Sequence, residues 1–382
     1  MPHYYPAVRY GGPIRSVQGL AAATAALGQD VHVYTTNVDG PGVSDVPTAE
    51  PVDVDGVKVW YFPAGAGRKV FRSPAMGRAL DATVGSFDVV HIHYMWVWTT
   101  VRAAAAARYW EVPYVLAPRG MLVADLIQRR RTAAKKIWLA LFDARNIARA
   151  AAIHATSDVE ATDLKVLGLA ARRIAVIPNG IDLHAERGVF GGSPAGVCAT
   201  TESRKRYILF LGRISWKKGL DRLIGALPTI EAADLVIAGY EEQSYAAVVK
   251  RLAEEGGVTG RVRFVGPTEG VDKWALIRGA ACLVLPSYHE NFGMTVIEAM
   301  AVGCPVVVTA EVGLSVVVAE TGSGLVAPGD HAGLAAAVNV VLNNPVRARA
   351  MGEAGRRVVA ERFGWPAIAA RMVELYAACA KG

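Results

Sequence analysis

Cysteine and long apolar runs are scarce in this sequence, and each scarcity excludes a class of protein. Only four of the 382 residues are cysteine, and they are scattered without the spacing of metal ligands. This excludes a disulfide-stapled scaffold and a structural zinc site, and it favours a reduced, cytoplasmic protein. No apolar run reaches the length of about 20 residues that a membrane-spanning helix needs. Internal repeats of solenoid period are lacking too, which excludes repeat proteins.

Hydrophobic residues make up 52% and charged residues 20% of the chain, which is typical of a globular protein. The length allows two ordinary domains, each with its own core. Apolar strand-like runs alternate with helical patterns in both halves, as in doubly wound parallel sheets. We therefore expect an α/β fold with two Rossmann-like domains, residues 1–184 and 205–365. Residues 185–204, which are rich in glycine, serine, alanine and threonine, are predicted to link them.

The net charge of +7 is concentrated in one segment. Residues 118–150 hold eight basic residues against two acidic ones, and the apolar residues of 134–142 follow helical spacing. The predicted helix is amphipathic, and its charge comes from Arg129, Arg130, Arg131, Lys135 and Lys136. Such a helix suits an anionic bilayer surface, but a core-packed helix with a solvated basic face gives the same pattern, so both interpretations stay open. Aromatic residues are not interleaved as stacking platforms, which argues against nucleic acid as a partner.

The most informative stretch is residues 289–300, which have the sequence HENFGMTVIEAM and follow the apolar run 281–287. The pattern predicts a buried strand, a tight loop and a helix in that order. In a parallel sheet, the end of a strand and the start of the next helix form an anion site, because free N–H groups and the positive end of the helix dipole face a phosphate there. Gly293 would let the backbone approach the phosphate closely.

Two glutamates bracket this element. Eight residues of helix turn the chain by about 80° net, so Glu290 and Glu298 can face one side of a pocket, roughly 10 Å apart. A phosphate repels carboxylates, so their expected partners are hydroxyl groups, to which they offer charge-assisted hydrogen bonds. In isolation the pair would be a solvated helix residue and a helix cap. Beside a phosphate site it suits a sugar nucleotide.

A second glycine turn follows the predicted strand 207–211. It contains Arg213 and Lys218, which offer a planar fork and a mobile point charge to a diphosphate. In the first half, the apolar strand 88–93 ends in two histidines that alternation places on the same face. His93 is nearer the carboxyl end of this strand, and His91 is expected to be a structural core residue.

Two weaker motifs lie near the amino terminus. Gly11 and Gly12 form a turn before the amphipathic segment 14–27, and the strand 31–35 is expected after it. Asp53 and Asp55 have the Asp-x-Asp spacing of a metal site. However, Asp55-Gly56 between alternating apolar residues is a strong hairpin signal, so we expect a turn and no metal there.

Together these motifs resemble the family 4 retaining glycosyltransferases of the GT-B fold, of the kind that builds bacterial exopolysaccharide or lipopolysaccharide. Residues 290–301 and 303–308 carry most of the likeness. The glycine loop at 11–12, the strand 88–93, the segment 177–182 and the turn at 212–219 occur in the family's order. The resemblance therefore covers nearly the whole chain. One departure is the segment after Gly313, which lacks the acidic residue that members usually carry.

The resemblance implies two Rossmann-like domains facing a cleft, with a final helix, residues 366–382, that packs back on the first domain. It also implies a hexosyltransferase that moves a sugar, with retention and without a metal cofactor, from a nucleoside-diphosphate sugar to a glycan or polyprenyl-linked glycan. The implied catalytic residues are Glu290, His93, Arg213 and Lys218. The implied donor-binding residues are Gly11, Gly12, Arg213, Lys218, Thr268, Glu290, Asn291, Phe292, Gly293, Met294, Thr295 and Glu298.

The implied mechanism assigns a role to each group. Glu290 orients the sugar hydroxyls, Glu298 contacts the ribose and His93 holds the sugar. Arg213, Lys218 and the amides around Gly293 stabilise the charge that grows on the leaving phosphate. The sequence shows no pair of carboxylates placed as in retaining glycosidases, so retention is expected from attack on the face that the leaving group vacates.

Two other functions fit parts of the pattern. One is a nucleotide-sugar epimerase of the same fold, which would not release nucleoside diphosphate in an acceptor-dependent way. The other is a non-catalytic basic protein that binds a membrane surface. The glycosyltransferase itself is expected to be cytoplasmic or peripheral on the inner membrane.

The beginning of the chain departs from the resembled family, in which a buried apolar strand precedes the glycine loop at the centre of the first sheet. Here the ten residues before Gly11 include Pro2 and Pro6, and each proline removes a donor that an internal strand needs. We therefore expect translation to begin upstream. We also expect a gap between the strand at Val31 and the strand at Val89.

Overall fold

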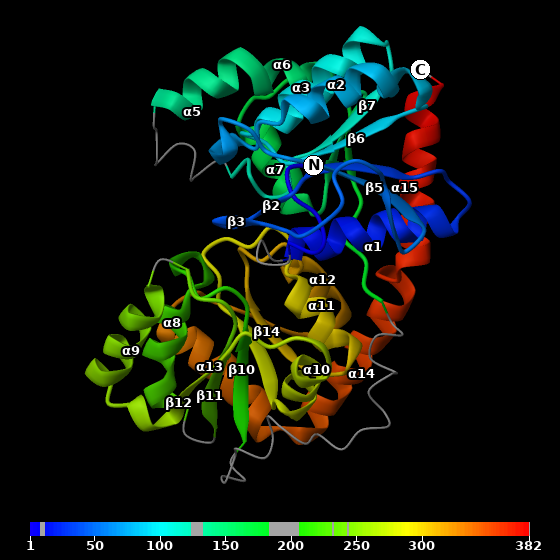
Figure 1. Ribbon diagram of the computed structural model, residues 1–382. Coiled ribbons are helices and arrows are strands. Elements are labelled where there is room, and N and C mark those ends of the chain that lie inside the picture. The colour runs from blue at the N-terminus through cyan, green and yellow to red at the C-terminus, as the bar shows by residue number, and fades with distance from the viewer. Residues whose placement is uncertain (8–11, 124–132, 183–205, 231–232, 243, 382) are drawn as a thin grey trace. The chain divides into compact units, whose positions relative to one another are not determined.

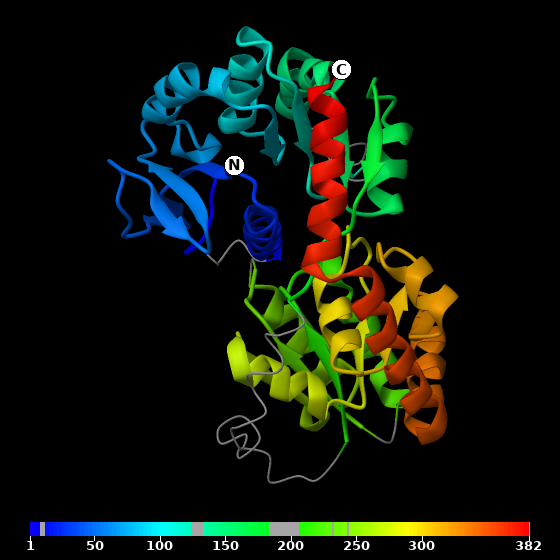
Figure 2. The same cartoon turned by 90° about the vertical axis from the view of Figure 1, so that its right-hand side faces the viewer.

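The computed structural model describes residues 1–7, 12–123, 133–182, 206–230, 233–242 and 244–381 (Figure 1). It divides into two compact units, Met1–Gly180 with Trp365–Gly382, and Ile181–Gly364. The α/β class predicted from the sequence is confirmed. The predicted linker, residues 185–204, lies wholly outside the described residues. Helix α15 (Trp365–Ala380), the long red helix in Figure 2, belongs to the first unit and contacts helix α1 (Gly12–Ala26) there.

The second unit contains one six-stranded parallel sheet with the order β12-β11-β10-β13-β14-β15. Its strands are β10 (Tyr207–Leu211), β11 (Asp234–Ala238), β12 (Val262–Gly266), β13 (Cys282–Leu285), β14 (Val306–Thr309) and β15 (Gly324–Ala327). The four central strands, β11, β10, β13 and β14, are mostly apolar and buried because helices cover both faces of the sheet. The first three strands extend the sheet in one direction and the last three in the other. The order therefore reverses between β10 and β13, which is where doubly wound sheets bind ligands.

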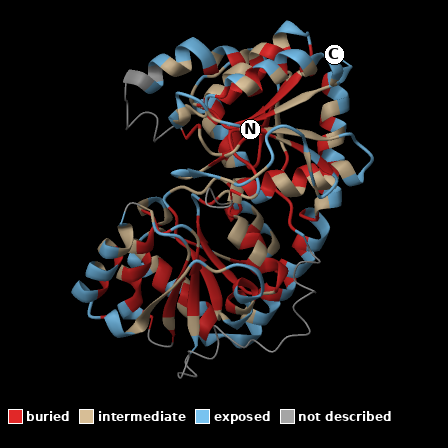
Figure 3. Cartoon of the chain, in the orientation of Figure 1, coloured by how far each residue is buried: buried red, intermediate tan, exposed pale blue. Residues whose placement is uncertain are grey.

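Helices connect these strands and follow the last of them. They are α8 (Leu220–Ala226), α9 (Tyr245–Glu255), α10 (Gly270–Gly279), α11 (Met294–Ala301), α12 (Ser315–Thr321), α13 (His331–Asn343) and α14 (Pro345–Arg362). Figure 1 shows α8 and α9 on one side of the strands and α10 and α11 on the other. The inner faces of the helices and the strands are buried, and the outer faces of the helices are exposed (Figure 3). This layered core makes the sheet a rigid base for the loops at its carboxyl edge.

The first unit contains two separate main sheets. A parallel sheet has the order β6-β7-β8-β9, and a smaller sheet has the order β1-β5-β4. The strands are β1 (His32–Thr36), β4 (Val52–Val54), β5 (Val57–Phe62), β6 (Val90–His93), β7 (Tyr114–Ala117), β8 (Ala152–Ala155) and β9 (Ile174–Val176). The short strands β2 (Val38–Asp39) and β3 (Gly42–Val43) form a ribbon of their own. Strands β1 and β6 are not paired, so the gap that we expected between them is confirmed.

The helices of the first unit include α2 (Pro74–Thr83), α3 (Trp98–Tyr109) and α7 (Asp158–Val166). The predicted hairpin is confirmed, since β4 and β5 pair antiparallel around Asp55 and Gly56. Both turn residues have positive φ, 54° and 77°, as a two-residue hairpin turn of type I′ requires. The Asp53 carboxylate accepts a hydrogen bond from the Gly56 amide at 3.2 Å. Asp53 therefore stabilises the hairpin turn.

The predicted basic helix is present where the structure describes it. It consists of α5 (Ala133–Trp138), a π-helical segment (Leu139–Asp143) and α6 (Ala144–Arg149). Arg129, Arg130 and Arg131 lie outside the described residues, as does the side chain of Lys136. The Lys135 side chain is exposed, and so are the apolar residues Ile137 and Leu141, at 56% and 61%. The described part of this helix therefore carries exposed apolar surface. In the described ranges, no helix combines the length and apolar character needed to cross a bilayer.

Candidate active site

In the second unit, two loops meet at the point where the strand order reverses. One follows β10 and contains Arg213 and Lys218, and the other follows β13 and contains Glu290 and Gly293. Both leave the carboxyl ends of neighbouring parallel strands, which pair through Ile208 with Cys282. The sheet thus brings the residues of two distant sequence motifs to the position where such folds bind nucleotides.

Lys218 and Glu290 form an ion pair, with the lysine Nζ donating to Glu290 Oε2. Their side chains are mostly buried, with 16% and 17% of their surface exposed. A mostly buried charge without a partner lowers the stability of the folded protein, so each of these two side chains needs either the other or a ligand of opposite charge or hydrogen-bonding character. A phosphate that approached Lys218 and a hydroxyl group that approached Glu290 could replace this pairing. The ion pair therefore holds one cation and one anion ready at this edge of the sheet.

The backbone fixes Glu290 from both sides. Its amide donates to the Glu311 carbonyl at 3.1 Å, and its carbonyl accepts from the Gly313 amide at 2.8 Å. The two functional loops are also joined directly, since the Tyr288 amide donates to the Lys217 carbonyl at 2.8 Å. These contacts are preorganised, so neither loop has to be rebuilt when a ligand binds.

Gly293 is the residue before helix α11, and it has φ of 101°, which favours glycine. A Cβ atom there would lie 3.2 to 3.3 Å from side-chain carbons of Val296 and Val312. The first amides of the helix, those of Met294 and Thr295, have no carbonyl partner within the helix. This is the geometry of an anion-binding helix start, as the sequence predicted. The neighbouring Phe292 is buried in the core against Phe363, so a donor contact at this position would come from its backbone.

Glu298 forms a second ion pair, in which Lys273 Nζ donates to its Oε1 at 2.9 Å. Both side chains are nearly buried, at 9% and 12% exposure. Lys273 also lies 4.7 Å above the ring of Trp274. Thr268, on the loop before helix α10, has a buried hydroxyl without a hydrogen-bond partner among the described residues. Lys273 could not be identified from the sequence, because nothing in its local pattern distinguishes it from a surface lysine.

Arg213 does not contact the Lys218 and Glu290 pair. Its guanidinium lies 3.4 Å from the Glu242 carboxylate, and its side chain is 54% exposed. A pair as exposed as this contributes little to stability, so the position of Arg213 is weakly constrained. It can serve as a donor-binding residue only by moving its side chain from this position.

Arg222 is a further residue that sequence reasoning missed. From helix α8 it donates to the carbonyls of Pro286 and Ser287, each at 3.3 Å, and its guanidinium stacks 3.7 Å above the Tyr288 ring. The Tyr288 hydroxyl donates to Asp221 at 2.6 Å. Arg222 thus links the helix that begins just after Lys218 to the loop that presents Glu290. The sequence offered one sign of this role, because Arg222 follows Lys218, a predicted phosphate contact, by four residues.

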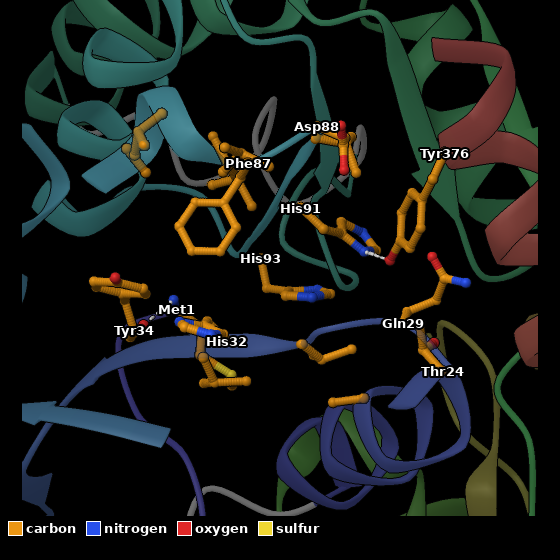
Figure 4. A pocket seen from close by; sticks show the side chains of 18 of the residues that line it. Met1, Thr24, Gln29, His32, Tyr34, Phe87, Asp88, His91, His93 and Tyr376 are labelled. Atoms are coloured by element: carbon orange, nitrogen blue, oxygen red, sulfur yellow. Dashed lines mark hydrogen bonds between the residues drawn. The ribbon is translucent and has the colours of Figure 1, made fainter. Parts of the chain in front are cut away.

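In the first unit, His93 lies at the carboxyl end of β6 and is buried. Its Nδ1 accepts a hydrogen bond from Arg119 Nε at 3.2 Å, so its Nε2 carries the proton. Burial, together with the neighbouring His91 and Arg119, holds the pKa of His93 well below its usual range. His93 is therefore a neutral hydrogen-bond donor. His91 is bonded to the Tyr376 hydroxyl at 2.7 Å, as expected of a core residue (Figure 4).

Arg119 was counted only as part of the basic segment, yet it is buried, with 8% of its surface exposed. Its Nη1 donates to Asn179 at 2.8 Å, and its Nη2 has no partner among the described residues. Its φ of 56° is unusual for a residue with a side chain, and such backbone strain is often found at functional sites. The Glu160 carboxylate accepts a hydrogen bond of 2.6 Å from the amide of the next residue, Gly120, and so stabilises the turn at Arg119 and Gly120. The sequence offered one sign of a special role for Arg119, because it lies between a proline and a glycine directly after a strand.

Three predicted donor residues remain, and the first, Asn291, lies between Glu290 and Phe292 and is partly buried. Gly12 is the first residue of α1, and Gly11 lies outside the described residues. Within the ranges that the structure describes, no three histidine, cysteine, aspartate or glutamate side chains gather as metal ligands would. The structure thus places His93 and Arg119 in the first unit and the Lys218, Glu290, Lys273 and Glu298 group in the second.

Known proteins share this sequence and architecture. Residues 11–180 match the family description "Glycosyl transferase 4-like domain" and residues 199–358 match "Glycosyl transferases group 1". A D-inositol 3-phosphate glycosyltransferase from Xylanimonas cellulosilytica is 31% identical over 97% of this chain and 92% of its own length. Sucrose-phosphate synthase from Thermosynechococcus elongatus has a TM-score of 0.78 at 25% identity, covering 96% of this chain and 93% of its own.

HepE from Anabaena, solved in complex with UDP and glucose, has a TM-score of 0.73 and covers 96% of both chains. Its 18% identity shows a common fold alone. The two family matches extend over both halves of the chain, and the first relative covers nearly all of it. The chain is therefore a glycosyltransferase and belongs to family 4, whose fold is GT-B.

Proposed function

We propose that this glycosyltransferase moves a hexosyl group from a nucleoside-diphosphate sugar to a glycan or polyprenyl-linked glycan, with retention, in the assembly of a bacterial surface polysaccharide. The observation that carries the proposal is the Lys218 and Glu290 ion pair beside the start of helix α11. It joins one cation and one carboxylate at a phosphate-binding position, as a sugar diphosphate requires. HepE, which was solved with UDP and glucose, supports the donor class.

In this mechanism, Lys218 and the first amides of α11 stabilise the charge that develops on the β-phosphate when the glycosidic bond breaks. Arg213 adds a second cation when its side chain leaves Glu242. These fixed donors could perform the work without a metal ion. Glu290, released from Lys218 by the phosphate, accepts hydrogen bonds from the sugar hydroxyls, and Glu298 accepts those of the ribose.

Retention requires attack from the face that the leaving phosphate occupied. The acceptor hydroxyl donates its proton to the departing phosphate oxygen while its own oxygen bonds to the anomeric carbon. Glu290 is held by a lysine and by two backbone hydrogen bonds, which suits an orienting group more than a nucleophile. His93, with its protonated Nε2, holds a sugar hydroxyl, and Arg119 keeps the His93 ring in that tautomer.

The first experiment is a thermal shift series with nucleoside diphosphates and sugar nucleotides. A ligand at 100 times its dissociation constant should add about 2.7 kcal/mol to the free energy of unfolding. Transfer from the stabilising donor is then followed by NMR, which reports the anomeric configuration of the product. An inverted product would disprove retention. Nucleoside diphosphate released equally well without any acceptor would favour hydrolysis or the epimerase alternative.

A second proposal concerns location. The exposed Ile137 and Leu141 beside the exposed Lys135 form an apolar surface with basic flanks, which favours the bilayer-surface interpretation over the core-packed one. We propose that this helix docks the enzyme on anionic lipids, where a polyprenyl-linked acceptor would be found. Flotation with vesicles of phosphatidylglycerol and phosphatidylcholine at low and high salt tests it. Equal recovery with purely neutral vesicles would contradict an electrostatic role.

A further inference from the structure

The carboxyl edge of the parallel sheet β6-β7-β8-β9 gathers polar residues from all of its strands. His93 is the last residue of β6, Arg119 follows β7 by two residues, Thr156 follows β8 directly, and Asn179 follows β9 by three residues. All four side chains are buried. The carboxyl ends of parallel strands are where such sheets bind ligands. The first unit therefore has a candidate binding position of its own.

Arg119 brings a permanent positive charge to this edge, because a guanidinium does not lose its proton in proteins. Its Nε donates to His93 Nδ1 at 3.2 Å, and its Nη1 donates to Asn179 Oδ1 at 2.8 Å. Both partners are uncharged, since burial holds the pKa of His93 well below its usual range. Nη2 has no partner among the described residues. Two N–H bonds of a buried cation are therefore unused.

Glu160 is the acidic side chain that acts on Arg119, yet its carboxylate is bonded to other donors. Its Oε1 accepts from the Gly120 amide at 2.6 Å, and its Oε2 accepts from the amide and the hydroxyl of Thr156 at 2.8 and 3.1 Å. Burial lowers the pKa of Arg119, and the charge of Glu160 offsets this effect only in part. The hydrogen bonds that Arg119 itself makes to described residues therefore include none to a counterion.

The two side chains bonded to Arg119 each keep a donor of their own. His93 Nε2 carries the proton, because Nδ1 accepts from Arg119. Asn179 accepts through Oδ1, so its Nδ2 can only donate, and no described residue accepts from it. Such N–H groups beside a cation select an acceptor with negative charge on its oxygens, since charge-assisted hydrogen bonds are shorter and stronger than neutral ones. A carboxylate and a phosphate both have this character.

We propose that Arg119 and Asn179 bind an oxyanion of the substrate, a carboxylate or phosphate group, at the carboxyl edge of the first unit's parallel sheet. Arg119 Nη2 and Asn179 Nδ2 donate to its oxygens. That this oxyanion belongs to a substrate rests on the transfer reaction proposed above. An arginine that only fixed the His93 ring would need one N–H, and a neutral donor could supply it without burying a charge. The site therefore requires a negative charge beside the hydroxyl group that His93 holds.

The test is an NMR titration of protein labelled with ¹⁵N and ¹³C in arginine, with glucuronate, inorganic phosphate and neutral glucose as probes. Arg119→Lys assigns the Arg119 Nε and Cζ signals by their loss. These signals should shift in a saturable way with at least one of the two anions and stay unchanged with glucose. A response to glucuronate alone identifies a sugar carboxylate, and a response to phosphate alone identifies a phosphate group. Arg261, whose Nη atoms donate to the carbonyls of Leu227 and Ala233 at 3.0 and 2.6 Å, is the internal reference.

Asn179→Asp is the second variant, because it gives Arg119 a carboxylate partner and removes the Nδ2 donor. The apparent affinity for the oxyanion should fall by about tenfold or more. The thermal midpoint should rise, because a buried charge gains a counterion. Asn343→Asp, an exposed position of the second unit, makes the same change in net charge and is the matched control. Equal affinity in Asn179→Asp and in its control would overturn the proposal.

Arg119 signals that respond to neither anion, or that respond equally to glucose, would also overturn it. A third variant, Lys218→Ala, removes the phosphate contact proposed for the second unit and should leave the Arg119 response intact. Loss of the response in this variant would contradict the assigned position, because the anion would then act from the second unit. The signals are read without turnover, so a failure of this site is distinguishable from a failure of the proposed transfer reaction.

Discussion

Each of the two glutamates in the second unit's site is held by a lysine, and the two pairs differ in how the sequence reveals them. Lys218 and Glu290 belong to recognisable motifs, so both could be predicted. Lys273 pairs with Glu298, but it lies 25 residues away in an ordinary helical pattern. Only the packing of helix α10 beside helix α11 brings these two side chains together. Residue types at motif positions were therefore predictable, whereas their partners depended on the fold.

Lys218→Ala should lower kcat by roughly a hundredfold, the scale of losing one donor that stabilises the transition state. Its exposed neighbour Lys217→Ala is the matched control, because it removes the same charge one residue away. The measurement is nucleoside diphosphate release at saturating donor. Similar kcat values for the two variants would show that Lys218 serves the fold and not the reaction.

Glu290→Gln and Glu298→Gln should separate the roles of the two glutamates. Glu290→Gln is expected to keep nucleoside diphosphate affinity and lose transfer, because it acts on the sugar. Glu298→Gln is expected to weaken nucleotide binding itself, and it leaves Lys273 without its counterion. Calorimetric titration with the nucleoside diphosphate and initial rates of transfer measure the two effects. The same profile in both variants would mean that the roles are wrongly assigned.

At the scale of elements, the site depends on two loops that separate strands hold in place. The sequence predicted both loops, since each follows an apolar strand and contains glycine. It did not predict the contact between them, in which Arg222 of α8 donates hydrogen bonds to the carbonyls of Pro286 and Ser287 in the loop after β13. Gly219 is part of the same junction, because a Cβ there would lie 2.0 Å from the Pro286 carbonyl oxygen. Such contacts join residues far apart in sequence and leave no periodic pattern.

Arg222→Lys should test whether this connection positions Glu290. Lysine keeps the charge but loses the fork and the stacking on Tyr288. We expect kcat to fall roughly tenfold while the donor KM and the thermal midpoint stay nearly unchanged. Arg251→Lys, on the exposed surface of helix α9, is the control. A raised donor KM with unchanged kcat would show instead that Arg222 binds the donor itself.

The basic helix is the element whose environment the sequence left open, because an amphipathic pattern is the same whether its apolar face meets a core or a membrane. Replacing Arg129, Arg130 and Arg131 by glutamine should weaken binding to anionic vesicles by about 1 kcal/mol per charge. The control replaces Arg347, Arg349 and Arg357, three exposed arginines of the second unit, in the same way. Equal losses in both variants would indicate a general charge effect and argue against docking by the basic helix.

At the scale of the whole molecule, the alternation of strands and helices predicted two doubly wound units, and the order of strands in each followed only from the structure. In the second unit the order is complete. In the first, the resemblance to the family placed a strand before the glycine loop, and two prolines in that segment argued against one there, so a break was predicted. The described sheets are divided between β1 and β6. The position of this discontinuity therefore followed from the resemblance and from the backbone chemistry of proline together. The buried histidines beside that break also make the two units respond differently to acid.

His3, His93 and His154 are buried in the first unit, and His91 is partly buried there. Burial is the main cause that lowers the pKa of each, those of His3 and His154 to about 3. Arg119 adds to this effect in His91, His93 and His154. In the unfolded chain a histidine titrates near pH 6.5. Above that pH both states are neutral and stability does not change. Below pH 6.5 these histidines bind protons in the unfolded chain but stay neutral in the folded chain. The free energy of unfolding therefore falls as the pH falls, by at most about 1.4 kcal/mol per pH unit for each histidine.

The first unit should therefore lose stability between pH 6.5 and pH 5, while the second should change less, because His289 and His331, its described histidines, are not buried. Urea unfolding followed by hydrogen exchange in peptides from each unit resolves the two transitions at pH 7, 6 and 5. The window ends at pH 5 because paired carboxylates begin to titrate below it. A loss shared equally by both units would mean that the histidine cluster is solvated or charged in the folded chain. His154→Gln, which keeps a hydrogen-bonding side chain without a titrating one, should flatten the decline of the first unit by about a quarter, because it removes one of four such histidines.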